Sequence, residues 1–420
     1  MPTPSLLIVP ARFKSGKLYS QIPTSGAGDF TVTRATAATR VNASGFIESV
    51  ASGIPRLDYF ASGGTVGCPA LLVEPSAQNQ CQRSEEFNNA FWLPDGLNLF
   101  GSGSVANTTA TLDPYGTNVA DYIQENSASS SSHRIIGIFS GNVSGTTYTW
   151  SVFSKAAERT IINLFNNGGG GGNANFNLIT GIATLTAGVS ASMQNYGNGW
   201  WRCALTYTSN ASGSHNVHIR LCDASGNTTY NGTGNQGAYI FGAQLETGSV
   251  ATSYIPTTTG SVTRNADVVS VSGAVSGSIG QTEGTIYVDA FIPKIASVFV
   301  VAIGSSGGIG EAVYLEVASN LDLRARIRSA STVVDLTISA ANWSAGLNKA
   351  AFTYGSGNCS LVLNGGSPVT GTVTFVPTCD RVVLGSRVDV PGTLSLTNRI
   401  RPTALYTTRL TNAQLQALTT

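Results

Sequence analysis

The 420-residue sequence has few charged side chains. Lysine, arginine, aspartate and glutamate together make up 11% of the chain, and 23 basic residues nearly balance 22 acidic ones. Soluble globular domains usually contain about 25% charged residues. Because neither sign is in excess, no field would concentrate phosphate groups, and nucleic acid is therefore not expected as a partner.

Long apolar runs and the local motifs of common catalytic and metal sites are also missing. No run of roughly 18 apolar residues occurs, so insertion into a membrane is not expected. The six cysteines form no C-x-x-C pair, which excludes a zinc knuckle and a dithiol redox motif. A Walker loop and an H-E-x-x-H motif are absent as well. The sequence thus predicts neither an enzyme nor a tightly bound cofactor.

Short runs of alternating apolar and polar residues, separated by Gly, Ser, Asn and Pro, recur along the chain. In the clearest run, residues 148–155, alternate side chains would face opposite sides of a sheet. Helical periodicity is confined to about the last dozen residues, where Thr411 and Gln414 have the spacing of a capping box. This pattern predicts an all-β chain of β-sandwich domains that ends in one short helix.

Two turn-rich segments, residues 75–79 and 256–260, divide the chain into three parts. Residues 1–78 are expected to form an extended N-terminal region, and residues 79–256 and 257–420 are each expected to fold as a separate sandwich. The N-terminal region has apolar stretches but too little periodicity for a core of its own. We therefore expect other copies of the chain to cover these stretches in a homo-oligomer.

Several blocks of sequence resemble known families. The N-terminal blocks resemble bacteriophage virion structural proteins of the fibre or appendage type, at residues 17–23, 28–35, 38–42, 55–59 and 68–75. The middle blocks resemble a jelly-roll, carbohydrate-binding-module-like domain, at residues 148–155, 197–203, 242–248 and 252–257. The last blocks resemble a concanavalin or laminin-G-type lectin domain, at residues 349–354, 361–365 and 400–418.

This resemblance implies a non-enzymatic tail-fibre, head-fibre or spike subunit that is made in the host cytoplasm and assembled on the phage virion. It implies a homotrimer that contacts other virion proteins through residues 1–78 and binds bacterial surface polysaccharide through its sandwiches. Two alternatives stay open: a purely structural capsid or tail decoration or collar protein, and a polysaccharide depolymerase. Single Asp and Asn ligands from separated loops would leave no local pattern, so calcium also stays open.

Aromatic residues are the first candidates for glycan contacts, because an exposed aromatic face can stack on the C–H bonds of a sugar ring. Trp200 and Trp201 are adjacent, so one indole should point into the sandwich and the other outward. Asn342 and Trp343 follow a predicted strand and could form a similar site. The alternative interpretation of each tryptophan is packing in a core.

Charged residues supply a second candidate site. Arg324, Arg326 and Arg328 alternate with apolar residues, which predicts a half-buried strand with three arginines on one face. Such a stripe could bind acidic polysaccharide or a carboxylate of another subunit, or it could simply be solvated. Glu311 and Glu316 lie five positions apart on a predicted strand and so face opposite sides of it, which argues against a glycosidase pair.

Overall fold

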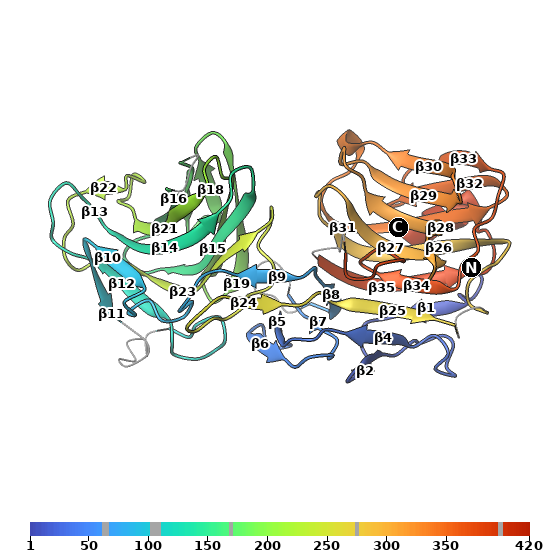
Figure 1. Cartoon of the computed structure of the whole chain (residues 1–420), viewed down its shortest axis with the longest axis horizontal. Helices are drawn as coiled ribbons and strands as arrows, with labels where there is room; N and C mark the ends of the chain where they lie inside the picture. Colours follow the sequence, from blue (N-terminus) through green and yellow to red (C-terminus); the bar gives the residue numbers. More distant parts are fainter. Residues whose placement is uncertain (61–66, 101–110, 168–170, 274–276, 394–397) are drawn as a thin grey trace.

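The computed structural model describes residues 1–420 except 61–66, 101–110, 168–170, 274–276 and 394–397. Two β-sandwiches lie side by side, and strands of the N-terminal segment run along the base of the molecule (Figure 1). Within the described ranges there is one α-helix, α1 (Asn412–Thr419), and one 3-10 helix, η1 (Ala340–Asn342). No described helix is both long and apolar enough to span a bilayer. The all-β prediction with a short C-terminal helix is confirmed.

The first sandwich consists of two six-stranded antiparallel sheets. The first of them has the order β10 (Trp92–Asp95), β14 (Arg134–Asn142), β21 (Gly213–Leu221), β16 (Ile161–Asn166), β17 (Asn173–Asn177) and β18 (Ile182–Leu185). The second has the order β11 (Leu97–Phe100), β12 (Asp121–Glu125), β23 (Gly237–Thr247), β15 (Thr147–Ala156), β20 (Trp200–Thr208) and β19 (Val189–Gly197). A short ribbon, β13 (Ser131–Ser132) with β22 (Thr229–Tyr230), lies beside them.

Alternation along the strands builds the core between these sheets. On β15, Trp150 and Val152 are fully buried, and they pack with Cys203 and Leu205 of the neighbouring β20. The predicted strand at residues 148–155 lies within β15. Strand alternation thus places one face of each sheet in a shared apolar layer.

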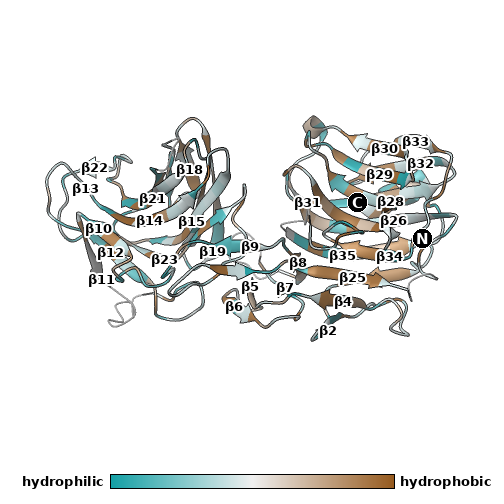
Figure 2. Ribbon diagram, viewed as in Figure 1, coloured by the Kyte–Doolittle hydropathy of each residue, from teal (hydrophilic) through white to brown (hydrophobic). Residues whose placement is uncertain are grey.

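The second sandwich consists of a nine-stranded and an eight-stranded sheet. The nine-stranded sheet has the order β2 (Phe13–Lys14), β3 (Lys17–Leu18), β4 (Phe30–Thr33), β25 (Val268–Ser272), β34 (Arg381–Leu384), β27 (Val298–Ser305), β28 (Gly308–Val317), β29 (Leu323–Ser329) and β30 (Thr332–Ile338). The other has the order β33 (Val369–Val373), β32 (Gly357–Leu363), β31 (Gly346–Gly355), β26 (Glu283–Ile292), β35 (Asn398–Tyr406), β8 (Ala70–Val73) and β7 (Leu57–Asp58), with β1 (Leu6–Ile8) also paired to β35. Figure 2 shows hydrophobic residues concentrated on strands such as β25 and β34.

Residues 1–78 do not form a separate region, which corrects the expected three-part division. β1 and β8 both pair with β35, and β4 pairs with β25, so the N-terminal strands extend both sheets of the second sandwich. The apolar stretches that were expected to need partner chains are covered within the same chain, since Leu6, Ile8, Leu71 and Val73 are all buried in its core. That argument for a homo-oligomer is therefore wrong, and the homotrimer stays a prediction.

The first expected linker, residues 75–79, pairs with residues that directly follow the second expected linker, residues 256–260. β9 (Ala77–Asn79) and β24 (Val262–Arg264) form a two-stranded antiparallel ribbon, and a hairpin of β5 (Ala38–Val41) and β6 (Ile47–Val50) lies nearby (Figure 1). The buried Asn79 amide donates hydrogen bonds to the carbonyls of Ala243, at 3.0 Å, and Ile255, at 2.8 Å. The first linker is thus joined to the chain that follows the second linker and, through Asn79, to the first sandwich.

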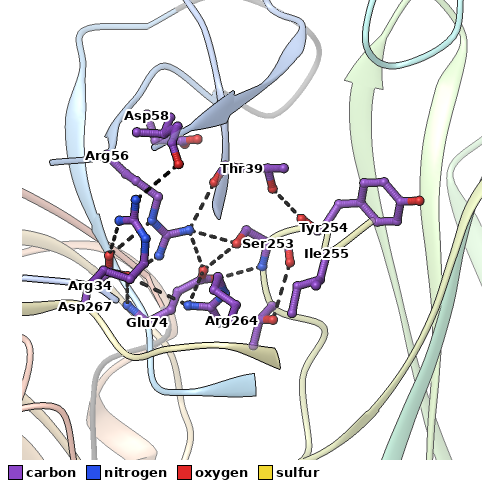
Figure 3. A network of polar contacts seen from close by, with 12 residues as sticks. Arg34, Thr39, Arg56, Asp58, Glu74, Ser253, Tyr254, Ile255, Arg264 and Asp267 are labelled. Atoms are coloured by element: carbon purple, nitrogen blue, oxygen red, sulfur yellow. Dashed lines mark hydrogen bonds and ion pairs between the residues drawn. The ribbon is translucent and has the colours of Figure 1, made fainter. Parts of the chain in front are cut away.

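A buried ion network joins these segments (Figure 3). Arg56 is fully buried, and its guanidinium contacts Glu74 Oε2 at 2.8 Å, Ser253 Oγ at 2.8 Å and the carboxylate of Asp267. Arg34 also contacts Asp267, at 2.9 Å. Burial alone would raise the pKa of Glu74, but the nearby arginines and the hydrogen bonds from Ser253 outweigh it and hold that pKa well below its usual range. The carboxylates of Glu74 and Asp267 are thus compensated by arginines that other segments of the chain supply.

Candidate functional site

Two of the predicted tryptophans are core residues and not exposed platforms. Trp200 is 1% exposed, packs with Phe153 and Tyr254, and donates its indole N–H to the carbonyl of Leu112 at 2.7 Å. Trp343 is 5% exposed and donates its indole N–H to the carbonyl of Leu321 at 3.0 Å. Because each indole N–H donates to a backbone carbonyl, burying the ring leaves this donor paired. The prediction of a sugar platform is wrong at both positions.

Trp201 points to the other side of β20, as alternation predicts. It packs against the core of the first sandwich while Trp200 belongs to a cluster on the opposite face. The Trp201 ring lies against Gly181, where a Cβ atom would come within 2.3 Å of it. Part of the ring stays accessible, so a glycan contact at Trp201 remains a prediction.

The arginine stripe lies on one face of β29, as predicted, but its charges are mostly compensated within the chain. The guanidinium of Arg324 is paired with Glu316 and lies 3.3 Å from Asp335, and Arg326 contacts Asp335 at 2.7 Å. Arg328 Nε donates to a backbone carbonyl. With these pairs formed, little charge is left to recognise an acidic polysaccharide.

The predicted residues do not form one site. Trp200 and Trp201 belong to the first sandwich, and the arginines belong to the second. Trp343 belongs to the same buried core cluster as Leu323 and Ile327 of β29, whereas the arginines lie on the other face of that strand. Asn342 is exposed in η1 beside the buried Trp343.

A cleft beside β9 and β14 has the chemistry that the predicted residues lack. It has a volume of about 340 Å³, and we call it the glutamine cleft, lined by Gln78, Gln80, Gln82, Phe91, Ile138, Phe139, Ser140, Gly141 and Ser261. All of these side chains are uncharged. The cleft therefore suits a neutral ligand that offers both hydroxyl groups and apolar C–H surface.

Alternating burial along β9 and the residues that follow it places the three glutamines on one face. Asn79 and Cys81, which lie between them, are fully buried, so Gln78, Gln80 and Gln82 point the other way. Gln78 donates to Thr263 Oγ1 at 3.2 Å and Gln80 donates to Thr247 Oγ1 at 3.4 Å. A glutamine amide has two donor hydrogens and an acceptor oxygen, so each retains hydrogen-bonding capacity for a ligand.

Phe91 forms the aromatic wall of the glutamine cleft. Its ring is held edge-on by Trp92, with centroids 5.2 Å apart, and by Phe139, at 5.6 Å. Ile138 of β14 adds an apolar side chain that is 47% exposed. The alternating glutamines were readable in the sequence, but nothing local indicated that Phe91 and Ile138 would join them.

A second groove lies beside α1 in the other sandwich. It has a volume of about 570 Å³ and is lined mainly by hydroxyl and amide side chains, including Thr353, Ser360 and Asn412. Its cation, Arg409, contacts Glu283 at 3.3 Å and donates to two backbone carbonyls. Because no aromatic residue lines this groove, it offers a sugar ring no stacking surface.

Groups for catalysis or metal binding do not converge in the part of the chain that the structure describes. There, no three His, Cys, Asp or Glu side chains are placed to hold a metal ion. Glu311 accepts hydrogen bonds from Ser329 Oγ and the Thr378 amide, and Glu316 is paired with Arg324. Both acids thus have partners within the chain. The absence of enzymatic activity stays a prediction, and calcium binding stays open.

His218 is a buried histidine of the first sandwich. It is 3% exposed on β21, its ring meets Phe165 edge-on at 5.0 Å, and neither ring nitrogen has a hydrogen-bond partner among the described residues. Burial, followed by the nearby charges of Arg220 and Arg134, lowers the pKa of His218 to about 4. The folded chain therefore holds this imidazole neutral.

This histidine predicts a loss of stability in mild acid. The pKa of an unfolded histidine is about 6.5, so between pH 6.5 and 4 the unfolded chain binds a proton that the folded chain does not. The contribution of His218 is thus complete above the unfolded pKa and is lost as the pH falls. Between pH 7.5 and pH 5 the free energy of unfolding should fall by about 2 kcal/mol through this residue.

Urea unfolding of the wild type and of His218→Gln at both pH values measures this effect. The pH dependence of the variant should be smaller by that amount. An unchanged pH dependence in His218→Gln would contradict the assignment.

Comparisons with known proteins give only distant likenesses. No family model and no curated protein matches the chain. The carbohydrate-binding module CBM40 of a Ruminococcus gnavus IT-sialidase is 17% identical, covering 34% of this chain and 84% of that one, with a TM-score of 0.30. Domains LG4-5 of the mouse laminin α1 chain are 10% identical, covering 84% and 91%, with a TM-score of 0.25.

A third likeness is the CBM22-1–CBM22-2 tandem of Paenibacillus barcinonensis Xyn10C, 9% identical, covering 83% of this chain and 99% of that one, with a TM-score of 0.24. At such scores, these likenesses carry no argument about ligand or activity. The sandwich architecture follows from the strand pairing itself. The virion role implied by the N-terminal blocks has no counterpart among these three structures and stays a prediction.

Proposed function

We propose that this chain is a non-catalytic glycan-binding protein that holds a neutral segment of a bacterial surface polysaccharide in the glutamine cleft. The observation that carries the proposal is the lining of that cleft, in which Gln78, Gln80 and Gln82 share one face and Phe91 supplies an aromatic ring. Amides pair with sugar hydroxyls, and the ring covers the C–H face of the sugar.

The chemistry of the cleft also sets the class of glycan. A carboxylated or sulfated sugar would lose hydration on entering the cleft and would meet no cationic side chain there. A neutral hexose loses less hydration and can replace it with amide hydrogen bonds. Binding at one cleft should be weak, so several copies on one particle or surface would supply the avidity.

Replacing both Gln80 and Gln82 by alanine should weaken binding of neutral glycan about tenfold, because at least one hydrogen bond per amide is lost. Isothermal titration calorimetry with a panel of neutral hexose oligosaccharides measures the effect on the full chain. The melting temperature should barely change, since both substitutions lie at the surface of the cleft. Phe91→Ala is a poorer test, because it also removes the contacts of that ring with Trp92 and Phe139.

Gln194→Ala is the matched control, since Gln194 is exposed on β19 and lies outside the glutamine cleft. It should bind like the wild type, and oligosaccharides that contain uronic acid should bind more weakly than neutral ones. If the wild type binds no neutral glycan, the purely structural decoration role replaces this proposal. If it cleaves the glycan, the depolymerase alternative replaces it.

The setting that we propose is an appendage of a bacteriophage particle. Support comes from the resemblance of the N-terminal blocks, whose strands also line the base of the second sandwich (Figure 1). Gold-labelled antibodies against the chain should then decorate purified particles in electron micrographs. Particles that carry no label would overturn the virion role and leave the glycan proposal untouched.

A further inference from the structure

One arginine of the buried ion network donates no hydrogen bond from its side chain to the described residues. Arg264, the last residue of β24, is 1% exposed, and its Nε, Nη1 and Nη2 atoms are buried without a hydrogen-bond partner there. Its Nη1 lies 3.4 Å from Glu74 Oε2 and 3.9 Å from Asp267 Oδ2, so only charge attracts it to these acids. Buried guanidinium groups normally pair their N–H donors with acceptors. Unpaired donors of this kind favour an acceptor from outside the chain.

The described residues of this network also carry one more positive charge than negative charges. Three arginines, Arg34, Arg56 and Arg264, contact two acids, Glu74 and Asp267. Burial lowers the pKa of Arg34, and repulsion by Arg56 and Arg264 adds to this effect, while Asp267 opposes it. Asp58, which is also drawn in Figure 3, is paired with Arg399. Arg34 and Arg56 both donate hydrogen bonds to the acids, so the excess charge is that of Arg264.

Arg264 also lines a cavity whose walls are mostly apolar. The cavity has a volume of about 260 Å³ and lies among the β5–β6 hairpin, β24 and residues 254–256. We call it the Arg264 cavity, and its apolar walls come from Ala37, Ala38, Tyr254, Ile255, Pro256 and Val262. Thr39 lines it too, and the carbonyl of Thr39 accepts a hydrogen bond from Arg56 Nη1 at 3.0 Å. The cavity therefore adjoins the ion network (Figure 3).

Threonine hydroxyls in the lining of the Arg264 cavity already have partners within the chain. Thr39 Oγ1 donates to the Tyr254 carbonyl at 2.5 Å, and Thr36 Oγ1 accepts from the Asn265 amide at 2.9 Å. Arg264 is the one charged residue among those that line the cavity in the described part of the chain. A ligand there would thus meet mainly apolar surface and a single cation.

We propose that the Arg264 cavity binds a small monocarboxylate with an apolar body, such as a short fatty acid. A carboxylate can accept two parallel hydrogen bonds from a guanidinium, and it brings the one negative charge that balances the network. A phosphate monoester would bring about 1.5 to 2 negative charges at pH 7, which exceeds the single excess positive charge. The apolar body gains because it leaves water for the apolar walls.

This site is distinct from the glutamine cleft, because no residue lines both. Its walls come from a hairpin near the N-terminus and from two segments more than 200 residues further along the chain. A ligand that contacts all three would hold them together, so binding should raise the melting temperature. Binding of neutral glycan should not depend on this cavity, so the two proposals can fail separately.

Isothermal titration calorimetry of the full chain with octanoate, 1-octanol and acetate tests the proposal. Octanoate should bind at least about tenfold more tightly than the other two, because 1-octanol lacks the charge and acetate lacks the apolar body. A wild type that binds no octanoate would overturn the proposal. Equal affinities for octanoate and 1-octanol would overturn recognition by charge, and equal affinities for octanoate and acetate would overturn the apolar cavity as the site.

Arg264→Met removes the excess charge and no hydrogen bond donated to either acid. Arg34 and Arg56 still compensate both carboxylates, so this variant should be less destabilised than Arg56→Met. Octanoate binding should weaken at least about tenfold, whereas 1-octanol binding should stay the same. Arg83→Met is the matched control, because Arg83 lies outside the cavity lining, and it should bind octanoate like the wild type. A folded Arg264→Met variant that binds octanoate like the wild type would overturn the proposal.

Ala37→Phe tests the cavity while the ion network stays intact. Ala37 is exposed and lines the cavity, so a phenyl ring there should fill part of it with little effect on the melting temperature. Binding of octanoate and of 1-octanol should both weaken. If Arg264→Met does not fold, this variant decides, because octanoate binding that is unchanged in Ala37→Phe would overturn the cavity as the site.

Discussion

Replacing Arg56 by methionine is expected to lower the free energy of unfolding by about 3–5 kcal/mol. Arg56 is fully buried, and its guanidinium compensates two buried carboxylates, those of Glu74 and Asp267. Methionine fills much of the same space but leaves both acids with less positive charge around them. The cost of an uncompensated buried charge is the reason for the size of the effect.

Guanidinium unfolding of the full chain measures this loss. Arg83→Met is the matched control, because Arg83 pairs with Glu86 at 2.9 Å but both side chains are about one third exposed. Such a surface pair contributes no more than about 1 kcal/mol. Equal effects of the two substitutions would contradict the view that burial makes the Arg56 network important.

Replacing Trp343 by alanine is expected to destabilise the second sandwich by about 3–5 kcal/mol. The indole is 5% exposed, its N–H bonds to the Leu321 carbonyl, and Lys294 Nζ lies 5.3 Å from the ring centroid. Alanine would leave a large cavity in the core cluster and would remove the N–H that the Leu321 carbonyl accepts.

Thermal and urea unfolding of Trp343→Ala give the size of this loss. The adjacent Asn342 is exposed, so Asn342→Ala should change stability by less than about 0.5 kcal/mol. If Trp343→Ala keeps its stability and loses glycan binding, the tryptophan is a ligand platform after all, as the sequence pattern first suggested.

Local patterns in the sequence predicted the features that depend on nearby residues. The capping box at Thr411 and Gln414 starts α1, with the Thr411 amide donating to Gln414 Oε1 at 2.9 Å. The alternation at residues 323–328 predicted a strand with its arginines on one face, and β29 has that pattern. Alternation also predicted that Trp200 and Trp201 point to opposite sides. Each of these features follows from helix or strand periodicity alone.

Whether the face of a strand is buried depends on segments that are far away in the sequence. The predictions about burial therefore failed or were incomplete. Trp200 is buried in a cluster with Phe241 and Tyr254, which lie about 40 and 50 residues further along the chain. The N-terminal strand β1 lies beside Leu405 of β35, across almost the whole chain. Alternation shows that a strand has an apolar face, but it contains no information about which distant strand will pair with it.

The sequence by itself determined the all-β class, the strands and the terminal helix, because composition and periodicity are properties of neighbouring residues. Only the tertiary structure decided which polar residues work together. It placed Arg56 between Glu74 and Asp267, and it brought Phe91 and the glutamines into one cleft. The reason is that burial of a charge or the closing of a cleft requires chain segments that meet only once both sheets have formed.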